Sequence, residues 1–171
     1  MLIYHPFQDI NHCAFRALLI LEQSVHEEID LDLYRLLDFY ILFPHLLKEI
    51  KPLPIELVSY RKVIAKIYEP YESLRNTKRV LYELEPLQTT TLRNLIAKKF
   101  LDVESFRSRK LKRTDLALPK ELNETIESSS LIGAEWFRMV INELPNISFL
   151  GGSGLKKRTG LMEFRYDLEV E

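Results

Sequence analysis

The chain has 171 residues, 46% of them hydrophobic and 29% charged, with a formal net charge of −1 at pH 7. A chain of this length buries about 70% of the surface that it exposes when unfolded, so we expect a folded globular protein of one domain or two small units. This composition excludes a disordered chain and a collagen-like repeat, and the single cysteine, Cys13, excludes a disulfide scaffold.

The apolar runs are too short for a membrane helix. The longest span residues 17–21 and 39–43, whereas a membrane helix needs roughly 20 apolar residues. Asp9 and His12 fall where the apolar core of a signal peptide would lie. Since one cysteine also fits a reducing compartment, we expect a cytoplasmic protein with no membrane partner.

The first 50 residues predict an N-terminal helical segment. A helix is expected from near Asn11, with Asp9 or Asn11 as its N-cap. A second helix follows Asp30 and ends or kinks at Pro44, because proline lacks the backbone donor. Residues 39–43 are apolar on every side of this helix, so part of their surface is expected to meet another chain.

Residues 51–118 predict a winged-helix-like unit. A third helix begins with Pro54 in its first turn. A fourth ends before Pro86, and a fifth follows the threonines at 89–91. Residues 100–103 and 110–113 are expected to form two short strands around a loop. Three helices followed by a hairpin are typical of winged helix-turn-helix domains, although plain helical domains also show this order.

The last third, residues 119–171, predicts C-terminal helices and one strand. Helices are expected from about Lys120 and over residues 131–143. Residues 162–168 alternate between apolar and charged side chains, which indicates a strand with one buried face. The expected fold class is therefore mainly α with minor β (α+β), and the three segments are expected to share one compact domain.

Positive charge is concentrated in the middle of the chain. Residues 71–118 hold 11 basic and 6 acidic residues, whereas the segments on either side carry net negative charge. Such an excess can attract phosphate or an acidic protein surface, or it can be a solvated face. The residues expected to bind DNA or a partner are Arg93, Lys98, Lys99, Arg107, Arg109, Lys110, Lys112 and Arg113.

Tests for catalytic motifs give no candidate. The glycine-rich run that begins at Gly151 lacks the order of a phosphate-binding loop, and the run that begins at His26 has Asp30 where a zinc protease has its second histidine. His12 and Cys13 are adjacent in a helix, so their side chains point about 100° apart and cannot easily form a nucleophile–base pair. We therefore expect no catalytic, cofactor-binding or metal-binding residue, and no cofactor.

The N-terminus carries an unusual F-x-D-x-x-H-x-x-F-R motif, made by Phe7, Asp9, His12, Phe15 and Arg16. Its structural interpretation is that Asp9 caps the first helix and pairs with His12 or Arg16. The alternative is an interface role for Arg16, since arginine readily forms bidentate pairs across subunits.

This opening, together with the helical body that leads into residues 100–108, resembles the small middle components of ABC three-component systems. In these systems, of which Lamassu-type defence against phages and plasmids is an example, a large SMC-like ATPase is encoded with a small middle protein and an effector. The resemblance implies a non-enzymatic accessory subunit. Such a subunit would bind the ATPase, hold an effector such as a nuclease inactive, and leave ATP hydrolysis and DNA cleavage to its partners.

Two other functions remain open from the residues themselves. A free-standing winged-helix transcription regulator would read DNA bases through Arg93 and Asn94. An enzyme of unknown type is the weaker alternative. Under the leading hypothesis, the partners are the SMC-like ATPase, the effector nuclease and double-stranded DNA, which the basic residues would contact.

Overall fold

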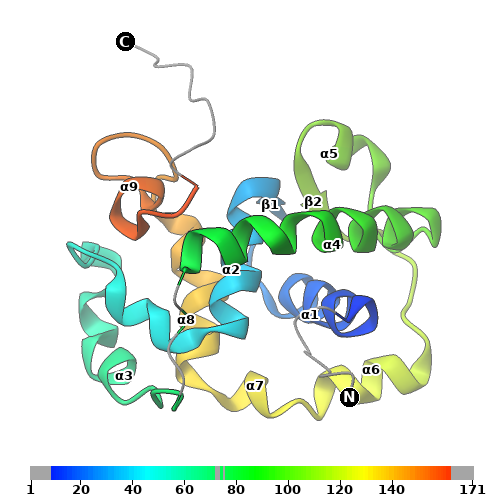
Figure 1. Cartoon of the computed structure of the whole chain (residues 1–171). Helices are drawn as coiled ribbons and strands as arrows, with labels where there is room; N and C mark the ends of the chain where they lie inside the picture. The colour runs from blue at the N-terminus through cyan, green and yellow to red at the C-terminus, as the bar shows by residue number, and fades with distance from the viewer. Residues whose placement is uncertain (1–8, 72–73, 75, 163–171) are drawn as a thin grey trace, which may run out of the picture.

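The computed structural model describes residues 9–71, 74 and 76–162. Helices dominate this part of the chain, and one small antiparallel sheet lies among them (Figure 1). The expectation of a mainly α fold with minor β is confirmed.

The first two helices begin where the sequence predicts. In α1 (Ile10–Gln23), the Asp9 carboxylate accepts hydrogen bonds from the backbone N–H groups of Asn11 and His12. Asp30 caps α2 (Leu31–Leu42) in the same way, and Pro44 opens the short 3-10 helix η2 (Pro44–Glu49). Local capping chemistry is enough to fix these boundaries.

Helix α2 is the centre of the fold. It packs against α1, α4 and α8, and ten of its twelve residues are buried. The surface at residues 39–43 that was expected to meet another chain is divided: Phe39, Tyr40 and Ile41 are buried inside this chain, whereas Leu42 and Phe43 are partly exposed. Most of that expected contact surface is therefore core.

The two helices expected on either side of Pro86 are one helix, and this prediction is wrong. After η3 (Ile55–Tyr60) and α3 (Arg61–Ala65), the chain forms α4 (Thr77–Ala97), which lies across α1 and α2 (Figure 1). Pro86 lies on the exposed face of α4, while Leu84 and Gln88 on the other face are buried. Burial of that face outweighs the backbone hydrogen bond lost at proline.

The expected hairpin also differs. Strand β2 (Lys110–Lys112) is present, but it pairs with β1 (Glu28–Asp30), with Ile29 opposite Leu111. The segment expected to be the first hairpin strand makes a single bridge at Leu101 and then forms α5 (Val103–Arg107). The pairing follows from burial, because Ile29 and Leu111 are the central residues of their strands and both face the core.

The last third is helical where it is described. Helix α6 (Lys120–Glu127) is followed by α7 (Ser130–Gly133) and α8 (Glu135–Asn142), so the helix expected over residues 131–143 is interrupted at Ala134. The short helices η4 (Leu144–Asn146) and α9 (Leu155–Thr159) complete the order. The strand expected over residues 162–168 lies outside the described residues, except for Met162.

The hydrophobic core draws on all three expected segments. Leu36 of α2, Leu92 of α4 and Phe137 of α8 belong to one buried cluster. The division into units at residues 50 and 118 stays a prediction. Among the described residues, no helix is both long and apolar enough to cross a membrane.

Candidate functional site

Arg16 of the N-terminal motif is buried among three helices. Its Nε donates a hydrogen bond to Oδ1 of Asp38 at 2.6 Å, and its Nη2 donates to Oδ2 at 3.3 Å. Gln88 of α4 donates from Nε2 to Asp38 Oδ2 at 2.8 Å. These three residues, which we call the Arg16 cluster, tie α1, α2 and α4 together.

This arrangement favours the structural interpretation of Arg16. The residue is only 7% exposed, so it offers little surface to a partner subunit. Its carboxylate partner, Asp38, lies 22 positions along the chain, whereas the sequence suggested Asp9. Burial opposes the charge of Arg16, but the Asp38 carboxylate outweighs burial and raises the pKa of Arg16 above its ordinary value.

Cys13 lies beside the Arg16 cluster, and its thiol is in a poorly reactive state. The thiol is buried, and burial together with the Asp38 charge raises its pKa to about 11. A cysteine nucleophile needs the thiolate form. Tyr34 of α2 is also buried there, and burial and Asp38 raise the pKa of its hydroxyl as well. The polar groups at this junction are suited to holding the helices in place.

The other motif residues are local. Asp9 is the N-cap of α1, His12 is exposed on the first turn, and Phe15 packs partly buried against the core. Phe7 lies outside the described residues. The motif therefore marks the start of a helix and supplies one buried arginine.

Sequence reasoning missed a second buried arginine, Arg35 of α2. Its Nη1 donates to Glu85 Oε1 at 2.8 Å and its Nη2 donates to Thr89 Oγ1 at 3.1 Å, both on α4. The available signal was the pair of charges, Arg35 and Asp38, that follow Asp32 inside an otherwise apolar helix. Buried charges are nearly always paired, so these two predict partners on a neighbouring element.

The eight basic residues expected to bind DNA or a partner come from one stretch of the chain, from α4 to the residue that follows β2. Arg93 is on α4, Lys98 and Lys99 follow its last turn, and the others lie on α5, on β2 or next to it. Lys99 and Arg109 both have left-handed backbone geometry, with φ of 64° and 58°. At Lys99 the turn is a Schellman motif, since Lys99 donates to the Ile96 carbonyl and Phe100 donates to that of Leu95.

Five of these basic side chains are neutralised inside the chain. Four of the five acidic partners belong to the N-terminal segment and lie against β2 and its neighbours, which the local charge count could not reveal. The fifth, Glu104, is three residues from its partner Arg107. The pairs are Arg107–Glu104, Arg109–Asp32, Lys110–Glu28, Lys112–Glu27 and Arg113–Glu22. The pKa of Glu28 is lowered by the hydrogen bond from Lys110, and that of Lys112 is raised by the hydrogen bond to Glu27.

Three of the eight cations remain without such a pair among the described residues. Arg93, Lys98 and Lys99 are exposed, and within residues 9–71, 74 and 76–162 none of them has an ion pair. The basic segment therefore presents less free charge than its composition suggests.

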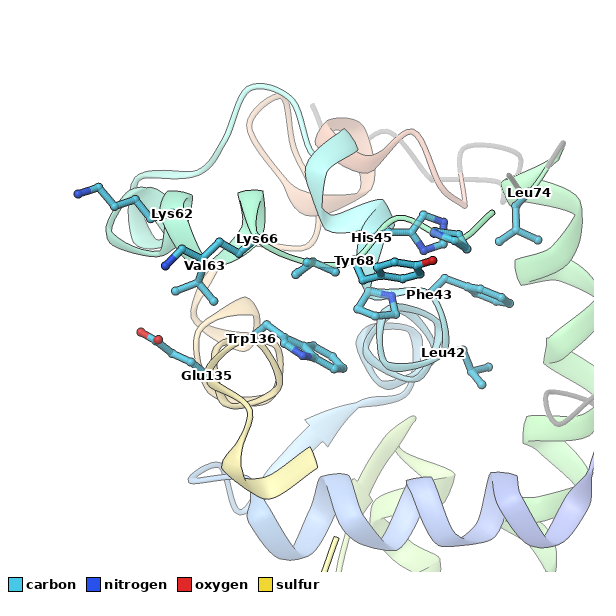
Figure 2. Close-up of a pocket in the computed structure, with 13 residues that line it drawn as sticks. Leu42, Phe43, His45, Lys62, Val63, Lys66, Tyr68, Leu74, Glu135 and Trp136 are labelled. Carbon is cyan, nitrogen blue, oxygen red and sulfur yellow. The ribbon is translucent and has the colours of Figure 1, made fainter. Parts of the chain in front are cut away.

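A groove that the sequence did not predict lies between the end of α2, η2, α3 and α8 (Figure 2). Its volume is about 770 Å³, within the range of small-molecule pockets. Several apolar residues from four parts of the chain line it, among them Leu42, Phe43, Val63, Ile67, Tyr68 and Trp136. We call this feature the α3 groove.

The edge of the α3 groove carries charge. Lys62 and Lys66, one turn apart on and just after α3, extend along one side, and Glu135 lies across from them (Figure 2). Lys48 donates from Nζ to the Ile67 carbonyl at 2.7 Å and pairs with Glu69 at 2.6 Å, which fixes the segment that carries Tyr68.

In the part of the chain that the structure describes, no group of three or more His, Cys, Asp or Glu side chains lies close enough together to hold a metal ion.

No curated protein and no solved structure matches the chain significantly. Residues 2–167 do match a family model, that of the ABC-three component (ABC-3C) system Middle Component 5. Because this match covers nearly the whole sequence, the chain belongs to the family of ABC-3C middle components.

Proposed function

We propose that this chain is a non-catalytic, cytoplasmic subunit of a Lamassu-type defence complex, in which it connects an SMC-like ATPase to an effector nuclease. The family match over residues 2–167 carries the proposal, because a middle component is an accessory part of a multi-subunit defence system. In this role the chain holds the effector inactive until the ATPase engages phage or plasmid DNA.

The chemistry of the described residues supports a binding role. The polar groups that could be mistaken for a catalytic centre, Arg16, Asp38 and Cys13, are buried, and the raised pKa of Cys13 keeps its thiol protonated near neutral pH. The α3 groove, in contrast, offers apolar side chains and cations at the surface. These features favour contact with other proteins.

DNA contact by the basic segment is a secondary element of the proposal. Arg93, Lys98 and Lys99 are the cations best placed for it, since the other five would have to exchange an acidic partner for a phosphate. A free-standing winged-helix regulator has weaker support, because β2 pairs with the distant β1.

Co-expression with the neighbouring ATPase and effector genes tests the proposal. We expect the three proteins to purify as one complex, and we expect the isolated chain neither to hydrolyse ATP nor to cut DNA. Failure of the wild-type chain to bind either protein would overturn the proposal. Metal-dependent turnover that stays with the isolated chain through further purification would overturn its non-catalytic part.

A further inference from the structure

We propose that the α3 groove is the docking site for a segment of a partner subunit that carries a large apolar side chain next to acidic residues. The inference rests on the proposed function, because it names the surface through which the middle component holds one of its partners.

The apolar part of the groove fits an inserted side chain. Phe43 and Trp136 are only partly covered by this chain, although both pack against the core. Tyr68 is 81% exposed at the edge of the groove (Figure 2). Aromatic side chains clustered in a concave, incompletely covered site are typical of the anchors that dominate protein interfaces.

The charges at the edge indicate an acidic partner. Lys62 and Lys66 are four residues apart and exposed, so two like charges face each other across one turn. Such a pair is unfavourable on an isolated helix. Neither lysine has an ion pair among the residues that the structure describes, whereas five cations of the basic segment each have one. Carboxylates of a bound segment would supply the missing neutralisation.

Two surface variants test this docking site. The first is the charge reversal Lys62→Glu/Lys66→Glu, and the second is Tyr68→Ala, which removes an exposed ring. The matched control is Lys51→Glu/Lys157→Glu, which makes the same change of charge at two exposed lysines outside the groove that also have no ion pair among the described residues. All of these side chains are exposed, so far-UV circular dichroism and the melting temperature should match the wild type.

Each variant is titrated against the purified ATPase and, separately, the purified effector, at low and high salt. We expect each groove variant to raise the Kd for one of the two proteins about tenfold or more, the effect of losing an interface anchor. The effect of the lysine reversal should shrink at high salt, because salt screens exposed charges. The control should stay near wild type.

The outcomes separate the docking site from the proposed function. If wild type binds both proteins and the groove variants bind as well as wild type, the docking site is wrong and the proposed function stands. If the control alone weakens binding, the partner docks on the surface around Lys51 and Lys157 and the inference is again wrong. If wild type binds neither protein, the proposed function itself fails.

Crosslinking identifies the occupant. A photoreactive phenylalanine analogue at position 68, irradiated in the assembled complex, should attach to a partner segment that contains an apolar residue within a few positions of Asp or Glu. Crosslinks only to residues 163–171 of this chain, only to a second copy, or only to a segment without acids would overturn the proposal.

Discussion

Two aspartates of α2 bind arginines in opposite surroundings. Asp38 pairs with Arg16 at 2.6 Å, and their side chains are 0% and 8% exposed. Asp32, six positions earlier on the same helix, pairs with Arg109 at 2.9 Å, with exposures of 24% and 57%. The two pairs share chemistry and helix, and they differ in access to water.

This difference decides what each pair does. Asp38 is buried away from water, and its carboxylate accepts hydrogen bonds from Arg16 and Gln88 instead. Because these residues lie on α1, α2 and α4, the inner pair holds the three helices in one arrangement. Without Arg109, Asp32 stays in contact with water and keeps its ion pair with Arg35 Nη1 at 3.5 Å. The outer pair therefore adds little to stability but reduces the free charge of the basic segment. A residue type and its partner are therefore insufficient to assign a role.

The largest expected effect is on the free energy of unfolding, when the arginine of the inner pair is replaced. Arg16→Met leaves Asp38 buried without its cation, and we expect the free energy of unfolding to fall by about 3–5 kcal/mol. The matched variant Arg109→Met should lower it by no more than about 1 kcal/mol. Urea denaturation of both variants measures the difference, and similar losses would break the distinction between the two pairs.

The second prediction concerns how stability changes at alkaline pH because of Cys13, which is buried beside the inner pair. Burial raises the pKa of Cys13 from 9.0 in the unfolded chain to about 11 in the folded protein. Between these values the unfolded state has released the proton and the folded state still holds it, so stability should fall as the pH rises, by up to about 1.4 kcal/mol per pH unit. Below pH 9 this contribution should be constant.

Urea midpoints from pH 8 to 11 test this, with Cys13→Ala as the variant that removes the thiol. We expect the decline to be shallower in Cys13→Ala than in wild type. Arg109→Met, which alters only the outer pair, should decline as steeply as wild type. Parallel curves for wild type and Cys13→Ala would contradict the burial of the thiol.

The smallest expected effect concerns DNA. If only Arg93, Lys98 and Lys99 are free to meet phosphates, the slope of log Kd against log salt concentration for duplex binding should be no more than about 2.7. All eight cations together would give about 7. Titration of the assembled complex and of the isolated chain with a random-sequence duplex measures this slope, and a value near 7 would show that the outer ion pairs open to bind DNA.

Sequence patterns correctly predicted helix boundaries that are set by neighbouring residues. Asp9 and Asp30 cap the helices that follow them, and Pro44 ends α2. Pro86 is the instructive failure, because proline predicts a helix end and yet α4 continues through it. The side of the helix on which a proline lies is decided by packing, and on an exposed face water can satisfy the carbonyl that proline leaves unpaired.

The candidate sites were less predictable than the helices. The basic residues were identified from the sequence, but four of the five that form ion pairs depend on acids about 77–91 positions away, as in Arg109–Asp32 and Arg113–Glu22. The α3 groove could not be predicted from the sequence, since its apolar residues belong to several elements and each resembles an ordinary core residue.

By itself, the sequence determined the helical fold class, the caps of α1 and α2, the basic character of residues 98–113 and the resemblance to middle components, because each depends on neighbouring residues or on a motif. Only the tertiary structure decided that Arg16 is buried against Asp38, that β2 pairs with β1, and that Lys62 and Lys66 edge an open apolar groove. The physical reason is that burial and charge pairing are properties of the packed chain, where residues far apart in sequence share or exclude the same water.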